Sequence, residues 1–389
     1  MRYKRFLQTI HTTSFLFGPR GTGKSTWLKE KYPHAAYIDM LNSETFRYYS
    51  AFPERALRIL DDYPQKECFI IDEVQKVPDI LSNLHSFIED HKDILFILTG
   101  SSSRKLKAKG VDLLAGRALL KTFHPFMASE LGNDFDIDKA LTLGMVPLVL
   151  TSSAPLETQR SYINLYLNEE VKEEGLTRNI GNFTRFLEII SFSQGSVLNL
   201  SEISRDSEVK RNTLDSYVSI LEDLLIAVRI PVFSHRAKRE LIRSRKFYFF
   251  DCGVFQGIRT KGPLEDAASL RGTALETLVM QHLRAWIEYS GKEIQLYFWR
   301  TRGGSEVDFI IYGENTFFAF EVKNTRNPRA KDTSGLRSFG QDYPPARLVL
   351  LYRGKEKKRR DGVDWIPVER FLRALSPDMS MQDVCSIVS

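Results

Sequence analysis

Short uninterrupted apolar runs alternate with polar, helix-like stretches over about the first 130 residues. The runs predicted to be strands are Ser14–Phe17, Ala35–Ile38, Cys68–Ile71, Ile94–Leu98 and Ala118–Thr122. The stretches predicted to be helical lie near Lys24–Lys31, Glu54–Asp62 and Ile80–Asp90. Apolar runs of this length, without alternation, are typical of parallel strands buried on both faces. The order of elements therefore predicts an α/β fold with a doubly wound parallel sheet.

The pattern becomes helical over residues 126–199, where apolar side chains recur with a period of 3.6, as in Phe183, Phe186, Leu187 and Ile190. Residues 200–250 then predict two helices, Ser201–Ser207 and Arg211–Leu225, and two strands, Val228–Val232 and Lys246–Phe250. Two helices followed by a β-ribbon form the outline of a winged helix.

A third pattern begins after Gly272. An amphipathic helix is predicted at Thr273–Tyr289. The strands predicted after it are Leu296–Trp299, Glu306–Tyr312, Thr316–Lys323 and Arg347–Tyr352. We therefore expect a parallel α/β core at residues 1–125, a helical connector at 126–199, a winged-helix-like module at 200–262 and a C-terminal α/β domain at 263–389.

Composition places the chain among ordinary globular proteins. Its 389 residues, with 42% hydrophobic and 27% charged positions, exclude disordered and collagen-like classes. The three isolated cysteines argue against a disulfide scaffold and a cysteine zinc site, so we expect a reducing, cytoplasmic location. No apolar segment is long enough for a signal peptide or a membrane span, and a membrane partner is not expected. The net charge of +6 permits nucleic acid binding without indicating it.

A complete phosphate-binding motif follows the first predicted strand. Its residues are Gly18, Pro19, Arg20, Gly21, Thr22, Gly23, Lys24 and Ser25, with Thr26 next to them. Glycines in such a loop let backbone N–H groups turn toward phosphates before the helix begins. Lys24 is expected to reach the β and γ phosphates of ATP, and Ser25 to bind Mg²⁺.

Polar residues also follow two of the later predicted strands. Asp72 and Glu73 follow Cys68–Ile71, at the edge of the sheet where ligands bind in open α/β folds. We expect Asp72 to hold Mg²⁺ through water and Glu73 to orient or deprotonate the attacking water, which favours an ATPase over a kinase. Ser101, after Ile94–Leu98, is a candidate contact for the γ-phosphate or that water, although a serine opening a loop is an equally good explanation.

These motifs resemble the AAA+ branch of P-loop ATPases, through the segments GPRGTGKST, FIIDE and TGSSS. More narrowly, the chain resembles a prokaryotic ATPase family with an AAA-type N-terminal domain, whose members carry a Leu-Ala-Gly-Arg element matched here by residues 114–117. The resemblance makes Arg117 a candidate phosphate-sensing or trans-acting arginine; the alternative is a surface arginine that opens a strand. It also implies a possible homo-oligomer.

Four charged residues fall on one predicted hairpin. A two-residue turn at Glu314–Asn315 places Asp308 opposite Glu321 and Glu306 opposite Lys323, with all four side chains on one face. Facing carboxylates repel each other unless a cation joins them, and Mg²⁺ or Mn²⁺ prefers such oxygen ligands. A solvated face with cross-strand ion pairs is the structural alternative.

The hairpin, preceded by a helix that carries Glu276, resembles the PD-(D/E)XK nuclease fold. The resemblance implies that Asp308 and Glu321 bind metal, that Glu276 is an additional acidic ligand, and that Lys323 is the catalytic base or stabiliser. A DNA substrate is then expected. The same fold without activity would serve as a binding platform.

Basic residues cluster in the middle module. Lys210, Arg211, Asn212 and Thr213 open the second predicted helix. The predicted ribbon carries His235, Arg236, Lys238, Arg239, Arg243, Arg245 and Lys246. Such a distribution is the electrostatic footprint of DNA contact, although many winged helices bind proteins instead. The sequence thus favours an ATPase coupled to metal-dependent DNA processing, with a nucleotide-switched scaffold as the alternative.

Overall fold

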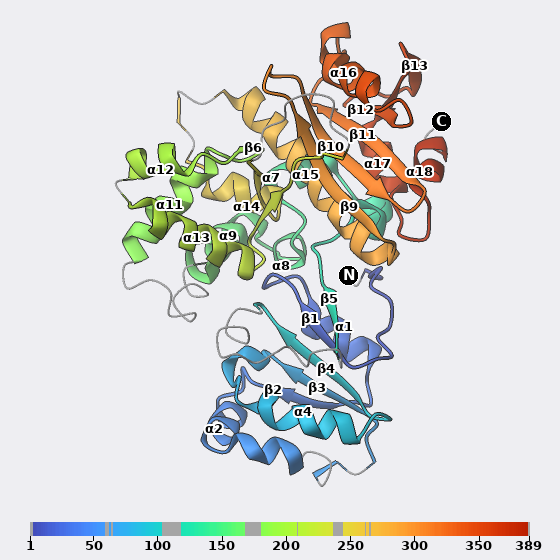
Figure 1. Ribbon diagram of the computed structural model, residues 1–389. Helices are drawn as coiled ribbons and strands as arrows, with labels where there is room; N and C mark the ends of the chain where they lie inside the picture. The colour runs from blue at the N-terminus through green and yellow to red at the C-terminus, as the bar shows by residue number, and fades with distance from the viewer. Residues whose placement is uncertain are drawn as a thin grey trace. The chain divides into compact units, whose positions relative to one another are not determined.

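The computed structural model describes residues 3–58, 62–63, 65–102, 118–167, 180–207, 209–235, 244–260, 262–263 and 266–387. The chain divides into two compact units, drawn in Figure 1. One unit comprises Leu7–His124 with Ser219–Ile226, and the other comprises the remaining residues.

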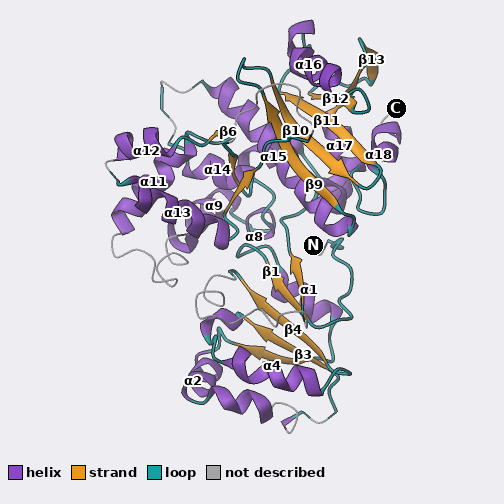
Figure 2. Ribbon diagram, in the orientation of Figure 1, coloured by secondary structure: helices purple, strands orange, loops and turns teal. Residues whose placement is uncertain are grey.

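The unit around Leu7–His124 contains a five-stranded sheet with strand order β2-β3-β4-β1-β5, in which all described pairings are parallel. Its elements are β1 Ser14–Phe17, α1 Lys24–Lys31, β2 Ala36–Asp39, α2 Ser43–Ala51, η1 Pro53–Arg58, β3 Cys68–Asp72, η2 Val74–Lys76, α4 Ile80–Asp90, β4 Leu95–Gly100 and β5 Leu119–Thr122. The predicted α/β class with a parallel sheet is confirmed, and Figure 2 shows the strands as arrows among the helices.

The apolar runs form the strands because both faces of the sheet are covered. Phe15, Phe69 and Phe96 lie on neighbouring strands and pack into one buried core. The strand order places β4 between β1 and β3, so the carboxyl ends of all three strands lie next to one another. Helix α2 was not predicted, and the expected helix at Glu54–Asp62 is a 3₁₀ helix over Pro53–Arg58, with residues 59–61 outside the described part.

The second unit begins with a helical region and a small antiparallel sheet, ordered β6-β8-β7. The elements are α6 Ala128–Leu131, η3 Gly132–Asp134, α7 Ile137–Leu143, α8 Pro147–Leu150, α9 Pro155–Ser161, η4 Tyr162–Leu167, α11 Ile180–Ser191, β6 Ser196–Val197, α12 Leu200–Ser207, α13 Arg211–Asp223, β7 Ala227–Ile230, β8 Lys246–Phe249 and α14 Cys252–Ile258. The last residues of α13, from Ser219, belong to the unit of Leu7–His124. The predicted helical character is confirmed, and the periodic Phe183, Phe186 and Ile190 are buried.

The C-terminal part of this unit is a six-stranded mixed sheet ordered β13-β14-β12-β11-β10-β9. Its elements are α15 Ala267–Ser290, β9 Ile294–Arg300, β10 Glu306–Gly313, β11 Thr316–Lys323, η5 Ala330–Thr333, α16 Ser334–Asp342, β12 Arg347–Tyr352, β13 Lys358–Arg360, β14 Val363–Pro367, α17 Val368–Ala374 and α18 Met381–Ile387. Helix α16 packs on the face that carries Ile310 and Ala319, while Phe320 on the other face contacts Phe371 of α17.

The β10–β11 hairpin has the predicted register, because Phe309 pairs with Phe320 and Gly313 with Thr316. A bulge between Val307 and Ile310 interrupts the pairing with β9. The extra residue moves Val307 onto the same face as Ile310, in the core under α16, rather than onto the face of Phe309. Asp308 lies inside the bulge, where its Oδ2 accepts a hydrogen bond from the Val322 backbone N–H over 2.9 Å.

Part of the charge run Lys355–Arg360 forms the exposed strand β13, which pairs antiparallel with β14. Among the helices of the described residues, none is both long and apolar enough to cross a membrane.

Candidate functional site

The predicted phosphate loop connects β1 to α1. Gly21 and Gly23 have φ values of 78° and 93°, a left-handed conformation that L side chains rarely adopt. The Thr22 hydroxyl donates to the Pro19 carbonyl over 2.8 Å and closes the turn. The motif glycines are therefore required by the backbone, and the loop runs directly into the first turn of α1, where N–H groups face outward.

Lys24 is almost completely buried inside this loop. Its ammonium donates to the Gly18 carbonyl over 2.6 Å and reaches the Pro19 carbonyl at 3.4 Å. The residue is 5% exposed. Arg20 and Ser25 are half-buried, and Thr26 is exposed at the start of the helix. The loop thus holds the lysine ammonium against its own backbone carbonyls.

Asp72 lies at the end of β3 and is 1% exposed. Its Oδ1 accepts a hydrogen bond from the Thr99 hydroxyl of β4, and its Oδ2 accepts one from the Tyr37 phenol of β2. Burial, and then the Asp72 charge, raise the pKa of Tyr37, so the phenol stays protonated. Asp72 is therefore held from both neighbouring strands, by Thr99 of β4 and Tyr37 of β2.

Glu73 has a left-handed backbone with φ 59° and follows Asp72 immediately. Its Oε2 accepts a hydrogen bond from Gln75 Nε2 over 2.5 Å, and the same nitrogen lies 3.1 Å from Ser101 Oγ. Gln75 is buried, and its Oε1 has no hydrogen-bond partner. The sequence patterns predicted neither Gln75 nor Tyr37 as a site residue. Gln75 follows the acidic pair but belongs to no recognised motif. Tyr37 lies in an apolar run that predicts only a buried strand.

Arg117 and its Leu-Ala-Gly-Arg element lie outside the described residues. The predicted sensing or trans-acting role of this arginine stays a prediction.

A second polar centre lies in the other unit, around the side chain of Lys246 on β8. Its ammonium is 2.8 Å from Glu276 Oε1, 2.8 Å from Glu306 Oε1 and 3.3 Å from Asp308 Oδ1. The Lys246 side chain is only 2% exposed. Burial alone would lower the pKa of Lys246, but the three carboxylates outweigh it and raise that pKa well above its ordinary value. Lys246 is therefore charged in the fold.

Glu321 and Lys323 lie beside this group on β11. Lys323 Nζ donates to Glu321 Oε1 over 2.6 Å, while Glu321 Oε2 is buried without a hydrogen-bond partner. Burial, followed by the charge of Asp308, raises the pKa of Glu321 to about 8. Burial lowers the pKa of Lys323, but Glu321 outweighs this effect, so the pKa of Lys323 is raised overall. The structure thus brings Asp308, Glu321 and Lys323 of the hairpin into one neighbourhood, as its register predicts. Glu276 of α15, which only the family resemblance implied, lies there as well.

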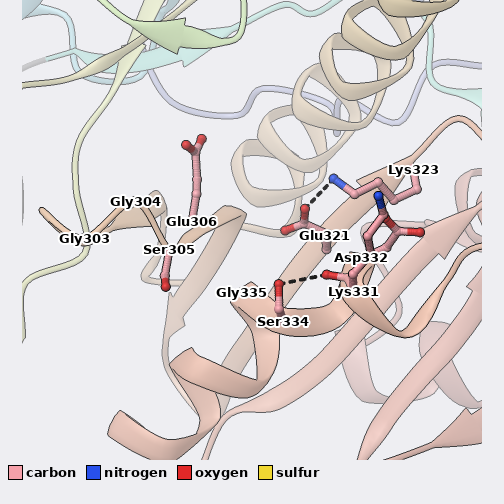
Figure 3. Close-up of a pocket in the computed structure, with 10 residues that line it drawn as sticks. All are labelled: Gly303, Gly304, Ser305, Glu306, Glu321, Lys323, Lys331, Asp332, Ser334 and Gly335. Atoms are coloured by element: carbon pink, nitrogen blue, oxygen red, sulfur yellow. Dashed lines mark hydrogen bonds and ion pairs between the residues drawn. The ribbon is translucent and has the colours of Figure 1, made fainter.

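An open cleft of about 390 Å³ leads to this neighbourhood. Figure 3 shows the Lys323 ammonium turned toward Glu321, with Ser334 and Lys331 of the neighbouring turn nearby. The residues that line the cleft are Gly303, Gly304, Ser305, Glu306, Glu321, Lys323, Lys331, Asp332, Ser334 and Gly335. Gly335 is needed because a Cβ there would lie 1.9 Å from the Glu306 carbonyl oxygen.

A divalent ion at this centre would need oxygen ligands that are not already engaged. Asp308 uses Oδ1 for Lys246 and Oδ2 for the Val322 N–H, and Glu276 Oε1 also contacts Lys246. Within the described ranges, no group of three His, Cys, Asp or Glu side chains is arranged to hold a metal. In this arrangement the cluster does not fit a metal bound by Glu276, Asp308 and Glu321, because Lys246 occupies its centre.

The basic surface of the middle region is described only in part. Arg236, Lys238, Arg239 and Arg243 lie outside the described residues. Lys210, Arg211 and Asn212 are exposed at the start of α13, and Thr213 is half-buried there. Arg245 is exposed, whereas His235 lies against the aromatic rings of Phe233 and Tyr312. The expectation that Lys246 contributes to an exposed basic ribbon is wrong, because the acidic cluster binds it in the interior.

The segment after β8 connects two parts of its unit through Asp251. Asp251 caps α14 through the N–H groups of Gly253 and Val254, and its other oxygen accepts from the Met145 N–H over 2.7 Å. Burial raises the pKa of Asp251. The carboxylate therefore ties α14 to the helical region that precedes it.

Residues 11–132 match the profile of a family described as "AAA domain". Residues 134–263 match "Domain of unknown function (DUF8612)", and residues 271–371 match "Domain of unknown function (DUF4143)". Two mycobacterial relatives, "Uncharacterized protein Rv2008c" of Mycobacterium tuberculosis and "Uncharacterized protein Mb2031c" of Mycobacterium bovis, are each 26% identical over 319 residues. The matches cover 79% of this chain and 70% of each relative.

Among solved structures, the "Replication initiator DnaA bound to AMPPCP and single-stranded DNA" is similar at 13% identity with a TM-score of 0.25, covering 56% of this chain and 83% of that one. "Protein VC1899 from Vibrio cholerae" is similar at 11% identity with a TM-score of 0.22, covering 97% and 98%. The AAA match over residues 11–132, together with the parallel sheet and its phosphate loop, supports a nucleotide-binding, AAA-type ATPase domain.

Proposed function

We propose that this protein binds ATP with Mg²⁺ and hydrolyses it at the carboxyl ends of β1, β3 and β4. The observation that carries the proposal is the convergence of three elements on one sheet edge. Lys24 is held in the phosphate loop, Asp72 is bound by Thr99, and Glu73 follows directly. If the loop after β1 were only a glycine-rich turn, nothing would require a buried carboxylate and a neighbouring glutamate at the end of β3. That strand lies two positions from β1 in the sheet.

Each residue then has a distinct role in the proposed reaction. Lys24 neutralises the β and γ phosphates, and the loop N–H groups from Gly21 onward bind their oxygens. Ser25 and Asp72 supply hard oxygen ligands of the kind that Mg²⁺ prefers, and the ion would offset charge on the phosphates. Glu73 orients the attacking water and accepts its proton.

The decisive experiment compares Lys24→Ala with the matched control Lys31→Ala, which removes an exposed lysine from the same helix. Binding of a fluorescent ATP analogue and release of phosphate are measured for both. We expect Lys24→Ala to lose nucleotide binding, because the phosphates lose their buried counter-charge, and Lys31→Ala to behave as wild type. Equal nucleotide binding by the two variants would refute the proposed site.

We further propose that nucleotide binding is coupled to DNA contact by the middle region. The element order α11-β6-α12-α13-β7-β8 with a small antiparallel sheet supports a winged-helix-like module. Exposed Lys210 and Arg211 at the start of α13 supply positive charge. A module that binds protein instead would show no affinity for DNA of any sequence at low salt, so fluorescence anisotropy with labelled duplex and single strands decides between the two.

A nuclease-like C-terminal domain is the second candidate activity. Its support is the grouping of Asp308, Glu321 and Lys323 beside a cleft, which matches the hairpin expected from the sequence. The engagement of Asp308 by Lys246 favours a binding platform over a cleaving enzyme in the conformation described here. Cleavage assays on single- and double-stranded DNA, with Mg²⁺ or Mn²⁺ and with or without ATP, test this candidate. Cleavage that disappears in Asp308→Ala would establish it.

A further inference from the structure

The β13–β14 hairpin ends the C-terminal sheet, and its outer strand has one edge without a partner strand. In the sheet that the described residues form, β13 pairs with β14 alone. Asp361 and Gly362, with φ values of 50° and 76°, form the two-residue turn between the strands, a conformation that tight hairpins prefer. Figure 1 shows β13 at the outer end of the sheet. The outward N–H and C=O groups of β13 can therefore pair with an added strand.

An open cleft of about 580 Å³ lies between this hairpin and α17, and most of its lining is basic. The basic residues that line it are Lys355, Lys357, Lys358, Arg359 and Arg370. Glu356 and Asp364 are the acidic ones, and Asp364 is already paired with Arg347 at 3.2 Å and with Arg359 at 3.7 Å. The cleft therefore carries a surplus of positive charge.

Two of these cations line the cleft without a partner. Neither Lys355 nor Arg370 has an ion pair, a hydrogen bond or a ring contact within the described part of the chain, and both are exposed. The side chain of Arg359 is 74% exposed and has only the long contact to Asp364. Like charges that line one cleft repel one another, so an anionic ligand would relieve the repulsion.

We propose that this cleft and the free edge of β13 bind an acidic, extended segment of a partner protein. The segment adds a strand to the sheet through its main chain, and carboxylates along one of its faces contact the cations of the cleft. Basic side chains on an edge strand, here Lys358 and Arg360, oppose pairing with neutral or basic strands, so the edge is selective for an acidic one. The proposal is independent of the proposed ATP site.

The hairpin favours a peptide over a nucleic acid as the occupant. The main-chain groups of a free strand edge form a ladder only with another polypeptide backbone. β13 has three residues and is about 10 Å long, which suits a short added strand better than the run of phosphates from which basic surfaces gain affinity for DNA. The Glu356 carboxylate in the lining would repel densely spaced phosphates, whereas a peptide carries its acidic side chains at wider intervals.

The test uses the full-length protein and three fluorescently labelled probes. They are a peptide of about ten residues that alternates glutamate with threonine, its glutamine counterpart and a DNA single strand of similar length. Anisotropy titrations compare wild type, Lys355→Glu with Arg370→Glu, and the matched control Lys292→Glu with Arg326→Glu, which reverses two exposed charges outside the cleft.

We expect wild type and the control to bind the glutamate peptide at least about tenfold more tightly than the glutamine peptide. The cleft variant should lose about tenfold or more in affinity for the glutamate peptide, because two attractive contacts become repulsive. Both of its substitutions are at exposed positions, so it should unfold at the wild-type temperature. If it does not fold, Lys355→Gln with Arg370→Gln is expected to show a smaller loss in the same direction.

Amide hydrogen exchange, followed by mass spectrometry, tests the main-chain pairing. The glutamate peptide should slow exchange in the fragments that contain β13 in wild type, and not in the cleft variant. A ligand held by side-chain charge alone would leave this exchange unchanged, and that result would overturn the proposed strand addition.

Three affinity results would also overturn the proposal. One is equal binding of the glutamate and glutamine peptides by wild type, and another is an equal loss of affinity in the cleft variant and the control. The third is a DNA strand that binds wild type more tightly than the glutamate peptide and loses this affinity in the cleft variant, because the cleft would then belong to nucleic acid.

Discussion

Gln75 holds Glu73 by a direct hydrogen bond, with 2.5 Å between the amide nitrogen and the carboxylate oxygen. The same nitrogen lies 3.1 Å from Ser101 Oγ at the end of β4. The glutamate assigned to the attacking water is therefore tied to the strand end where the γ-phosphate is expected. Gly100 makes this possible, because a Cβ there would lie 2.4 Å from Gln75 Oε1.

Gln75→Ala should lower the turnover number of ATP hydrolysis about tenfold with little change in KM, because Gln75 orients Glu73 and has no role in holding phosphate. Steady-state phosphate release over a range of ATP concentrations separates the two parameters. Gln65→Ala, at an exposed position, serves as the control and should match wild type. A rise in KM with unchanged turnover would place Gln75 in nucleotide binding instead.

Glu73→Gln should keep ATP binding and lose most turnover, by about 100-fold or more, because an amide orients water but cannot take its proton. Nucleotide affinity and single-turnover hydrolysis are measured on the same preparation. The control is Glu67→Gln, an exposed glutamate just before β3. Turnover by Glu73→Gln at the wild-type rate would remove Glu73 from the role proposed for it.

The parallel sheet and the phosphate loop could be predicted because their signals are local. The apolar runs around Phe15, Phe69 and Phe96 predict buried strands, and Gly21 and Gly23 predict a loop with positive φ. The strand order that places β4 between β1 and β3 could not be predicted, since it depends on which runs pair across long separations. Tyr37 and Gln75 acquire their contacts only through that order.

The hairpin register could be predicted for the same reason, since a two-residue turn fixes the pairs Phe309–Phe320 and Gly313–Thr316. The bulge at Asp308 has no sequence signal of its own, and it changes the face on which Val307 lies. Lys246 was misplaced because it follows a run of basic residues in the sequence. Its burial depends on three carboxylates that are 30 to 62 positions away along the chain, and local charge patterns do not report such pairs.

Replacing Arg236, Lys238 and Arg239 together by alanine should weaken DNA binding and flatten its salt dependence. Each lost phosphate contact lowers the slope of log K against log salt by up to about one unit, because fewer counterions are released. Fluorescence anisotropy at several salt concentrations gives the slope. The three residues lie outside the described part of the chain, so this prediction comes from the sequence.

A matched control for the basic ribbon is the triple replacement of Lys355, Lys358 and Arg360, which removes the same charge from the exposed run at β13. This control should keep the wild-type salt slope, although the net charge of the protein falls equally. A common decrease in both triple variants would show that only overall charge matters, and an unchanged slope in both would mean that the ribbon contacts protein.

His282 on α15 should make the stability of the C-terminal unit depend on pH below neutrality. Its Nε2 accepts a hydrogen bond from the Ala128 N–H over 2.8 Å, and its Nδ1–H donates to the Leu278 carbonyl over 2.7 Å, so the ring is neutral in the fold. Burial lowers the pKa of His282 from 6.5 to about 4. Between these two values the unfolded chain binds more protons than the folded one, so acidification favours unfolding.

The contribution of neutral His282 to the free energy of unfolding should therefore be fully present above pH 6.5. It should fall as the pH is lowered toward 4, by about 3 kcal/mol at most. Urea unfolding at several pH values measures this slope in wild type and in His282→Gln. The glutamine keeps an acceptor for the Ala128 N–H but does not titrate, so its slope should be smaller. The control His34→Gln, at an exposed position, should retain the wild-type slope. Equal slopes in all three proteins would show that His282 is not the group whose protonation destabilises the fold.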